Sequence, residues 1–265
     1  MLPIINYVGG KRRMLKHIKP ILPKFEVYHE PFIGGGALFF DLEPDKAYIC
    51  DSNERLIRFY TAMSRWPHTI CEKLDKLSKL QDKQNYLEIR KQFNDDIDDI
   101  SFAAYYIYFN KVSFGSVMRF NNSGQFNVPY WKAHGRIYTP SHIHAASKLL
   151  SHTKILCIDF AEYCRNFIGQ DLTGHLFYFD PPYLGTVTAK ESYYGKFTHK
   201  QMIDAATYAY TLSEHGASVI VSYNEKMENY LPGFERVKHD IKYSINSKKQ
   251  TKCQELIFIK GDFHD

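Results

Sequence analysis

Short apolar runs alternate with amphipathic segments along this chain, and the alternation predicts a sheet covered by helices. Runs of roughly four to eight apolar residues bounded by turn formers indicate buried strands. This pattern predicts a strand that begins at Val27 and further strands at residues 47–51, 154–158, 176–179, 217–222, 234–243 and 255–260. Helical spacing predicts helices between several of them, including 140–150 and 198–215. Strands that alternate with helices favour an α/β fold with a mostly parallel sheet, and the last two strands are expected to be antiparallel neighbours.

The alternation is interrupted in the first half of the chain. Apolar residues at Leu56, Ile57, Tyr60 and Met63 recur at helical spacing, and two or three helices are expected before the aromatic run at residues 102–109. No strand–helix unit fits this stretch. We therefore expect residues 56–145 to form an inserted helical subdomain within a catalytic domain made of residues 1–55 and 146–265.

A basic and aromatic stretch follows the helical region. Residues 122–124, Asn-Ser-Gly, are typical of a hairpin turn between Phe120 and Phe126. Three basic residues interleave with the aromatics: Lys111, Arg119 and Lys132. Such a ribbon can enter a groove of DNA, where Arg119 would offer a forked donor to guanine. A surface hairpin whose aromatic rings pack on the helices explains the pattern equally well.

The apolar run at residues 176–179 ends at Asp180, which is followed by Pro181, Pro182 and Tyr183. Proline cannot continue a central strand, so the chain must leave the sheet there. A carboxylate and a proline carbonyl can each accept one hydrogen of an exocyclic amine, and the Tyr183 ring can stack on a planar base. Because Asp and Pro also favour turns, a plain strand-ending turn is the alternative.

Two further motifs precede this one. The stretch from Val27 to Phe40 predicts a strand, a glycine turn and a helix, and a second strand ends at Asp51. This order favours a nucleoside site, because glycines let a ligand approach the backbone and an acid at the end of the second strand commonly binds ribose. The incomplete glycine pattern disfavours a nicotinamide cofactor. At Gly9, Gly10 and Lys11 we expect the start of a helix that runs to about residue 18, with Lys11 either near an anion or solvated.

Composition adds few constraints. The 265 residues are 44% hydrophobic and 24% charged, which is typical of a soluble globular protein. A net charge of +5 permits a polyanionic partner, and an aromatic fraction of 15% leaves rings available to stack on bases. The odd number of cysteines lacks a Cys-x-x-Cys pair, and the histidines are scattered, so we expect reduced thiols, no metal site and a cytoplasmic location.

With these motifs in place, the chain resembles the Dam-type DNA adenine methyltransferases, the alpha group of amino-methyltransferases that use S-adenosylmethionine. Three motifs occur in the family's order: Tyr-x-Gly-Gly-Lys at 7–11, Pro-Phe-Ile-Gly-Gly-Gly at 31–36 and Asp-Pro-Pro-Tyr at 180–183. The resemblance covers nearly the whole chain. It implies a Rossmann-like class I methyltransferase fold with an inserted target-recognition subdomain. It also implies methyl transfer from S-adenosylmethionine to the amine of an adenine flipped out of duplex DNA.

The resemblance implies roles for individual residues. The catalytic site would comprise Asp180, Pro181, Pro182 and Tyr183. The cofactor would be bound by Tyr7, Lys11, Phe32, Gly34, Gly36, Asp51, Asp159, Phe160 and Asp180. The DNA-binding residues would be Lys111, Phe114, Arg119, Asn121, Pro129 and Lys132. The sulfonium donor is already activated, so this chemistry needs no metal.

Some family members that recognise GATC carry a Tyr-Asn pair where this chain has Phe114 and Gly115. Phe114 can still wedge into the base stack, but Gly115 cannot replace the side-chain amide of the asparagine. The recognition sequence is therefore open, with GATC as one candidate. The expected partner is double-stranded DNA and not a membrane. A monomer is the default, with several copies on one DNA as the alternative. Rival activities are methylation of cytosine N4 or of adenine in RNA, and silent nucleic-acid binding on the same fold.

Overall fold

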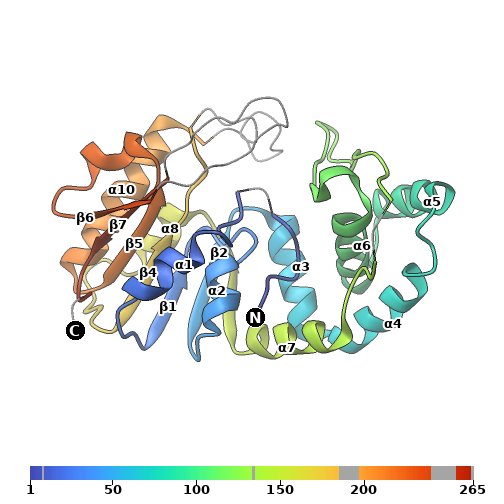
Figure 1. Ribbon diagram of the computed structural model, residues 1–265, viewed down its shortest axis with the longest axis horizontal. Coiled ribbons are helices and arrows are strands. Elements are labelled where there is room, and N and C mark those ends of the chain that lie inside the picture. Colours follow the sequence, from blue (N-terminus) through green and yellow to red (C-terminus); the bar gives the residue numbers. More distant parts are fainter. Residues whose placement is uncertain (8, 133–134, 185–196, 240–254, 264–265) are drawn as a thin grey trace.

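The computed structural model describes residues 1–7, 9–132, 135–184, 197–239 and 255–263 (Figure 1). Within these ranges the strands form one sheet in the order β3-β2-β1-β4-β5-β7-β6. Strands β3, β2, β1, β4 and β5 run parallel, and β7 lies antiparallel between β5 and β6. The strand bounds are β1 Val27–Glu30, β2 Ala47–Asp51, β3 Thr153–Cys157, β4 His175–Phe179, β5 Ser218–Tyr223, β6 Glu235–His239 and β7 Glu255–Lys260.

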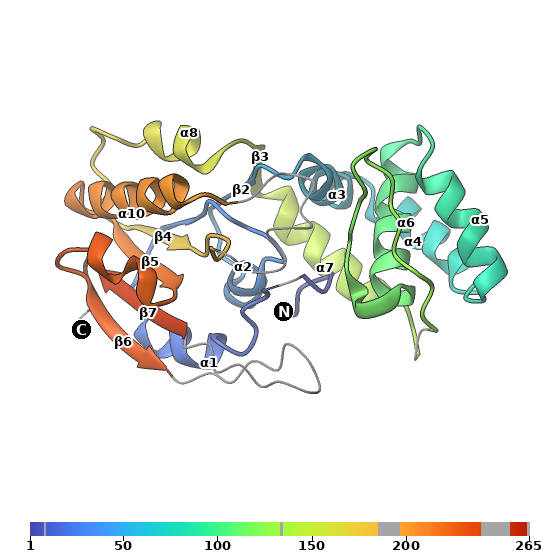
Figure 2. The ribbon, with the colours of Figure 1, turned by 90° about the horizontal axis from the view of Figure 1, so that it is seen from above.

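Helices cover both faces of this sheet. Figure 2 shows α8 (Phe160–Arg165) and α10 (His199–Glu214) on one face, and α1 (Leu15–Ile18) and α2 (Ala37–Leu42) on the other. Successive side chains of a strand point to opposite faces. In β4, Phe177 and Phe179 accordingly join the core under α8 and α10, whereas Leu176 and Tyr178 join the core that contains α2. Both sides of the strands are therefore apolar, as expected for parallel strands buried on both faces.

The remaining long helices extend the molecule to one side of the sheet and are coloured from blue (α3) to yellow-green (α7) in Figure 1. They are α3 (Glu54–Arg65), α4 (Pro67–Leu77), α5 (Lys83–Phe93), α6 (Asp99–Val112) and α7 (Pro140–Ser151). Helix α3 contacts both β2 and β3, and it also packs on α6 and α7. Helix α3 is therefore shared: it covers the sheet and also packs with the helices that lie to one side of it. Side-chain caps begin three of these helices, at Asn53, Asp82 and Asp98.

The hairpin after α6 is held by isolated bridges and not by full strands. Phe120 pairs with Phe126, and Ser113 pairs with Tyr130. Two short 3-10 turns, η1 (Lys19–Ile21) and η3 (Glu225–Tyr230), lie elsewhere, and a third, η2 (Phe114–Ser116), begins the segment that leads into the hairpin. The Phe126 ring is buried against Phe93 and Phe109. Packing on the helices is thus observed for Phe126, whereas Phe114 is 57% exposed.

The predicted α/β fold with a mostly parallel sheet and antiparallel final strands is confirmed. The helix predicted at residues 198–215 is confirmed as α10, and Thr198 forms a capping box with Gln201. Residues 240–243 of the predicted strand at 234–243 lie outside the described residues. In the part of the chain that the structure describes, no helix is long and apolar enough to cross a membrane.

The prediction of a helix starting at Gly9, Gly10 and Lys11 is wrong. Gly9 has φ +80°, and the amide of Gly10 donates to the carbonyl of Tyr7, so this stretch is a turn. A second turn follows, in which the amide of Met14 donates to the carbonyl of Lys11, and α1 begins only at Leu15. Lys11 therefore lies in an irregular segment between two turns.

Candidate active site

Asp180 follows the last residue of β4 directly, at the carboxyl edge of the sheet. Strand β4 is central, paired in parallel with β1 and β5, so the carboxyl ends of three strands meet at this edge. The chain leaves the sheet at Pro181, which is buried, and Pro182, which is exposed. The carboxyl ends of parallel strands are where open α/β sheets bind ligands.

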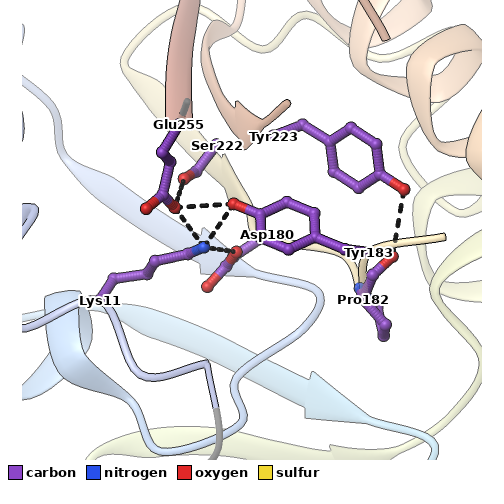
Figure 3. Close-up of polar contacts among 7 residues, drawn as sticks. All are labelled: Lys11, Asp180, Pro182, Tyr183, Ser222, Tyr223 and Glu255. Carbon is purple, nitrogen blue, oxygen red and sulfur yellow. Dashed lines mark hydrogen bonds and ion pairs between the residues drawn. The ribbon is translucent and has the colours of Figure 1, made fainter. Parts of the chain in front are cut away.

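A buried lysine lies between two carboxylates at this edge. The Lys11 amine is 3.1 Å from an Asp180 oxygen and also pairs with the Glu255 carboxylate (Figure 3). Lys11 is 4% exposed and Glu255 is 1% exposed. Because a buried charge is costly without a partner, each of the three groups depends on the others. The assembly joins the N-terminal turn, the end of β4 and the start of β7.

Tyr183 is fixed by the same assembly. Its hydroxyl accepts a hydrogen bond from the Lys11 amine at 2.8 Å and donates one to the Glu255 carboxylate at 2.8 Å. The Lys11 amine also lies 4.5 Å from the centre of the Tyr183 ring. The edge of Tyr223 packs on this ring with 4.9 Å between centroids. The Tyr183 ring is therefore held in one plane at the exit of β4.

The turn after Asp180 is tied to β5. The Tyr223 hydroxyl donates to the carbonyl of Pro182 at 3.3 Å and accepts from the amide of Leu184 at 3.0 Å. Ser222, the neighbour of Tyr223 in β5, donates to Glu255 at 3.0 Å. Two successive residues of β5 thus brace the two sides of the site, the proline turn and the buried glutamate.

The environment of Asp180 favours its neutral form more than water does. Burial raises the pKa of its carboxyl to about 6, with the Glu255 charge acting in the same direction and the Lys11 charge opposing both. Desolvation and a neighbouring like charge both disfavour a carboxylate. A carboxyl group with a pKa near 6 at the mouth of a sheet is typical of a functional site.

A second cluster surrounds the glycine turn after β1. Gly34 and Gly36 have φ values of +46° and +66°, a region that favours glycine. The amide of Gly34 donates to Asp51 at 3.2 Å, and the hydroxyl of Tyr60 donates to the Gly34 carbonyl at 2.8 Å. The Tyr7 side chain packs on the turn, since a Cβ atom on Gly35 would lie 2.7 Å from the Tyr7 Cβ.

Asp51, at the end of β2, also accepts from the amide of Asn53 at 2.9 Å. Burial raises the pKa of Asp51, although its backbone hydrogen bonds act against that rise. Aromatic rings lie nearby, with the Phe32 and Phe160 centroids 4.8 Å apart. Asp159 caps α8 by accepting from the amide of Ala161 at 2.9 Å. Asp51 ends β2, and Phe32, Asp159 and Phe160 follow β1 and β3, so all four lie at the carboxyl edge that carries Asp180.

The predicted DNA-binding residues lie away from the carboxylate cluster: Lys111 is in the last turn of α6, and the others follow it at residues 114–132. The amide of Phe114 donates to the carbonyl of Pro129 at 2.9 Å, which joins the two arms of the segment. Arg119 donates to Asn127 at 3.1 Å, and the Asn121 side chain accepts from two amides of its own turn. Lys132 is exposed, whereas Lys111 is half-buried, and burial lowers its pKa with help from the Arg12 charge.

Several residues of the site were missed by sequence reasoning. Glu255 and Ser222 were assigned only to strands, and Tyr223 was given no role after the strand predicted at 217–222. Trp131 was also missed: it is 54% exposed and its ring lies edge-on to Phe114 at 5.2 Å. Among the described residues, no group of three or more His, Cys, Asp or Glu could hold a metal ion.

The strand order, with an antiparallel β7 between β5 and β6, is that of the class I methyltransferases. Residues 7–252 match the family described as D12 class N6 adenine-specific DNA methyltransferase. The chain belongs to this family, which includes the Dam enzymes, and is an adenine-specific DNA methyltransferase.

Relatives named as methyltransferases or methylases align over most of the chain. It is 35% identical over 206 residues to a type II methyltransferase of Lactococcus lactis subsp. cremoris, covering 75% of this chain and 70% of the relative. It is 31% identical over 276 residues to a type II methyltransferase of Methanocaldococcus jannaschii, covering 93% of each. The DNA adenine methylase of Escherichia coli K12 is 25% identical over 228 residues, covering 84% of this chain and 81% of the relative.

Proposed function

We propose that the chain transfers a methyl group from S-adenosylmethionine to the exocyclic amine of an adenine flipped out of duplex DNA. The observation that carries the proposal is the buried assembly of Lys11, Asp180, Tyr183 and Glu255 at the carboxyl end of β4. Its parts come from segments far apart in sequence, and a plain strand-ending turn would not need them.

Asp180 and the proline turn would hold the amine. The Asp180 carboxylate accepts one amine hydrogen, and the Pro181 carbonyl accepts the other, since the Pro182 carbonyl already accepts from Tyr223. The Tyr183 ring, braced by Tyr223, stacks on the base. Holding both hydrogens lets the amine nitrogen become tetrahedral and aim its lone pair. The site thus acts by positioning and electrostatics.

The glycine turn fits a cofactor that carries a nucleoside. The positive φ of Gly34 and Gly36 favours glycine, and glycine has no side chain to block a ligand. The Asp51 carboxylate accepts hydrogen bonds from the amides of Gly34 and Asn53, and its other lone pairs can accept from ribose hydroxyls. Phe32 and Phe160 offer apolar rings to an adenine. The cofactor supplies an activated methyl group. The protein's part is to bind it through these residues and to keep Asp180 within reach of the target base.

We propose residues 56–145 as the target-recognition subdomain, with α3 shared between it and the sheet. The exposed Phe114 is the candidate wedge into the base stack, and Arg119 the candidate reader of a base edge. Arg55 supports the hairpin by donating to the Gly124 carbonyl at 3.1 Å and lying over the Phe120 ring. GATC is the candidate sequence, although Gly115 offers no side-chain amide to a base.

Methyl transfer from labelled S-adenosylmethionine to unmethylated DNA tests the proposal when the product nucleosides are resolved. We expect the label in N6-methyladenine, and more of it in a duplex with GATC than in one where GGTC replaces that site. Asp180→Asn should abolish transfer while leaving cofactor binding intact. Asp171→Asn, the same change before the other end of β4, should leave transfer unchanged. Label in cytosine, or in RNA alone, would overturn the proposal.

A further inference from the structure

Asn110, in the last turn of α6, connects two segments on either side of it. The side chain is fully buried, and all of its hydrogen bonds described here go to backbone atoms. Its oxygen accepts from the amide of Asn6 at 2.8 Å, and its nitrogen donates to the carbonyl of Asn6 at 2.8 Å. The same nitrogen donates to the carbonyl of Ser116 at 3.0 Å. One amide therefore fixes the N-terminal segment and the turn η2 together.

The N-terminal partner leads directly to the cofactor turn. Asn6 precedes Tyr7, whose side chain packs against Gly34 and Gly35. The contact is close, because even a Cβ atom on Gly35 would lie 2.7 Å from the Tyr7 Cβ. If Tyr7 shifts when the glycine turn binds a ligand, the neighbouring Asn6 would therefore shift too, and its hydrogen bonds to Asn110 would move the Asn110 side chain.

The other partner leads to the segment that would contact DNA. Ser116 has φ +56°, a left-handed conformation that is unfavourable for a residue with a side chain, and the preceding Gly115 has φ +69°. Such a conformation persists only when its surroundings hold it, and the bond from Asn110 is one such restraint. This turn also begins with Phe114, which is 57% exposed. The position of Phe114 thus depends on a strained turn that Asn110 holds.

We infer that Asn110 is a positioning residue that couples the cofactor turn to the Phe114–Ser116 segment. A cofactor bound at the glycine turn restricts the positions of Tyr7 and Asn6. Because Asn110 is bonded to both Asn6 and Ser116, the turn at residues 114–116 is restricted as well. The affinity for DNA therefore rises. By linkage, DNA must raise the affinity for the cofactor by the same factor. The inference rests on the proposed function, because it takes the glycine turn as the cofactor site and the hairpin segment as the DNA contact.

Binding measurements on the full chain test this coupling. The dissociation constant of a duplex that the wild type methylates is measured by fluorescence anisotropy with and without saturating S-adenosylhomocysteine, which has no methyl group to transfer. We expect the cofactor product to tighten DNA binding by about fivefold or more in the wild type. In Asn110→Asp, which keeps the acceptor and loses both donated bonds, the factor should fall close to one.

Asn94 provides a matched control within the helical extension. Its side chain also makes a two-way amide pair with a backbone, donating to the carbonyl of Phe126 at 3.1 Å and accepting from its amide at 2.7 Å. It therefore supports the hairpin without contacting Asn6. Asn94→Asp should weaken DNA binding equally with and without S-adenosylhomocysteine, so that the coupling factor stays at the wild-type value.

A second measurement needs no variant and covers the case in which Asn110→Asp does not fold. In the wild type without DNA, S-adenosylhomocysteine should slow hydrogen exchange of the amides at residues 114–118. Unchanged exchange there, a wild-type coupling factor near one, or full coupling in Asn110→Asp would each overturn the inference. Methyl transfer by the wild type is assayed in parallel: transfer without coupling removes this inference alone, whereas no transfer to DNA removes the proposed function as well.

Discussion

The hydroxyl of Tyr183 donates a hydrogen bond to the carboxylate of Glu255 at 2.8 Å, although the two residues are 72 positions apart in the sequence. Tyr183 belongs to the motif at the end of β4, and Glu255 begins β7, which lies beyond β5 in the sheet. The same glutamate pairs with Lys11 and accepts from Ser222. A buried acid outside the Asp-Pro-Pro-Tyr motif therefore orients both the lysine and the tyrosine of the site.

Glu255→Gln should lower kcat while leaving cofactor affinity near the wild-type value. The amide keeps the shape of the side chain but removes the charge that pairs with Lys11, so Lys11 and Tyr183 lose their common anchor. We expect a loss of about 100-fold, the size associated with misplacing reacting groups by about 1 Å. Single-turnover methyl transfer at saturating DNA and cofactor, with the cofactor dissociation constant measured separately, checks this.

Ser222→Ala is the control for that variant. It removes one hydrogen bond to Glu255 and keeps the carboxylate charge, so the pairing with Lys11 and Tyr183 is retained. A modest change in kcat is expected. If Glu255→Gln transfers methyl groups at the wild-type rate, the orienting role of Glu255 is wrong.

On the acid side of the pH–rate profile, kcat/KM should fall to half of its maximum near pH 6. The pKa of Asp180 is raised to about 6, mainly by burial, and the protonated carboxyl is a poorer acceptor for an amine hydrogen. Below this pH, kcat/KM should fall about tenfold per pH unit. Because the pKa of Asp180 is higher in the folded state than in the unfolded state, protonation of this group favours folding, so its titration does not itself unfold the protein.

Initial rates between pH 5 and 8 measure this profile, with circular dichroism confirming that the chain stays folded. In Glu255→Gln the fall of kcat/KM on the acid side should move to lower pH, because the Glu255 charge raises the pKa of Asp180. A wild-type profile that stays flat down to pH 5 would contradict the assigned role of the Asp180 carboxylate.

The end of strand β4 could be predicted from the residues around it. An apolar run that ends at Asp180 and two prolines has few other interpretations, and β4 ends where expected. The turn at Gly9–Lys11 was predicted as a helix start because helix propensity ignores what the lysine side chain contacts. In the structure this stretch is a turn, and its lysine pairs with Asp180 and Glu255, which are distant from it in the sequence.

The same limit applies to the hairpin. Sequence alone predicted an aromatic, basic ribbon, but it did not separate Phe126, which packs on Phe93 and Phe109, from the exposed Phe114. Burial depends on how the two arms of the segment sit on α5 and α6. Asn110 carried no sequence signal, since an asparagine near the end of a helix commonly faces solvent.

Gly35→Ala should disturb the glycine turn through Tyr7. The backbone of Gly35 does not need a left-handed conformation, so the substitution acts by contact: the new Cβ would lie 2.7 Å from the Tyr7 Cβ. Overpacking of this kind costs about 1–3 kcal/mol in the free energy of unfolding. We also expect weaker cofactor binding, because Tyr7 must move away from the turn. Urea unfolding and calorimetric titration with S-adenosylhomocysteine measure the two effects.

The double variant Tyr7→Gly with Gly35→Ala separates this contact from other effects of the alanine. Tyr7→Gly removes the Cβ atom that the new methyl group would meet, so Gly35→Ala should cost less in that background than in the wild type. Equal costs in both backgrounds would mean that the effect of Gly35→Ala does not act through Tyr7.

His29 predicts how the stability of the chain depends on pH. Its ring is fully buried in β1, stacked 4.0 Å from the Phe177 ring, with its nitrogens bonded to the Tyr163 hydroxyl and to His175. Burial lowers the pKa of His29, with the neighbouring His175 and Lys46 acting in the same direction. The folded state therefore keeps His29 neutral at a pH where the unfolded chain, with a pKa of about 6.5, takes up a proton.

The stability that this neutral histidine permits is present above about pH 6.5 and is lost as the pH falls, by at most about 1.4 kcal/mol per pH unit. Urea unfolding of the wild type and of His29→Leu at pH 7.5, 6.5 and 5.5 measures this contribution as the difference between their slopes. The raised pKa values of Asp180 and Glu30 oppose the slope in both proteins, and the lowered pKa of His175 adds to it. His29→Leu is expected to be less stable at pH 7.5, because Tyr163 and His175 lose a partner, but to depend less on pH. His68→Gln, at a position that is 81% exposed, should keep the wild-type slope. Parallel pH dependences in His29→Leu and the wild type would contradict a lowered pKa of His29 in the folded protein.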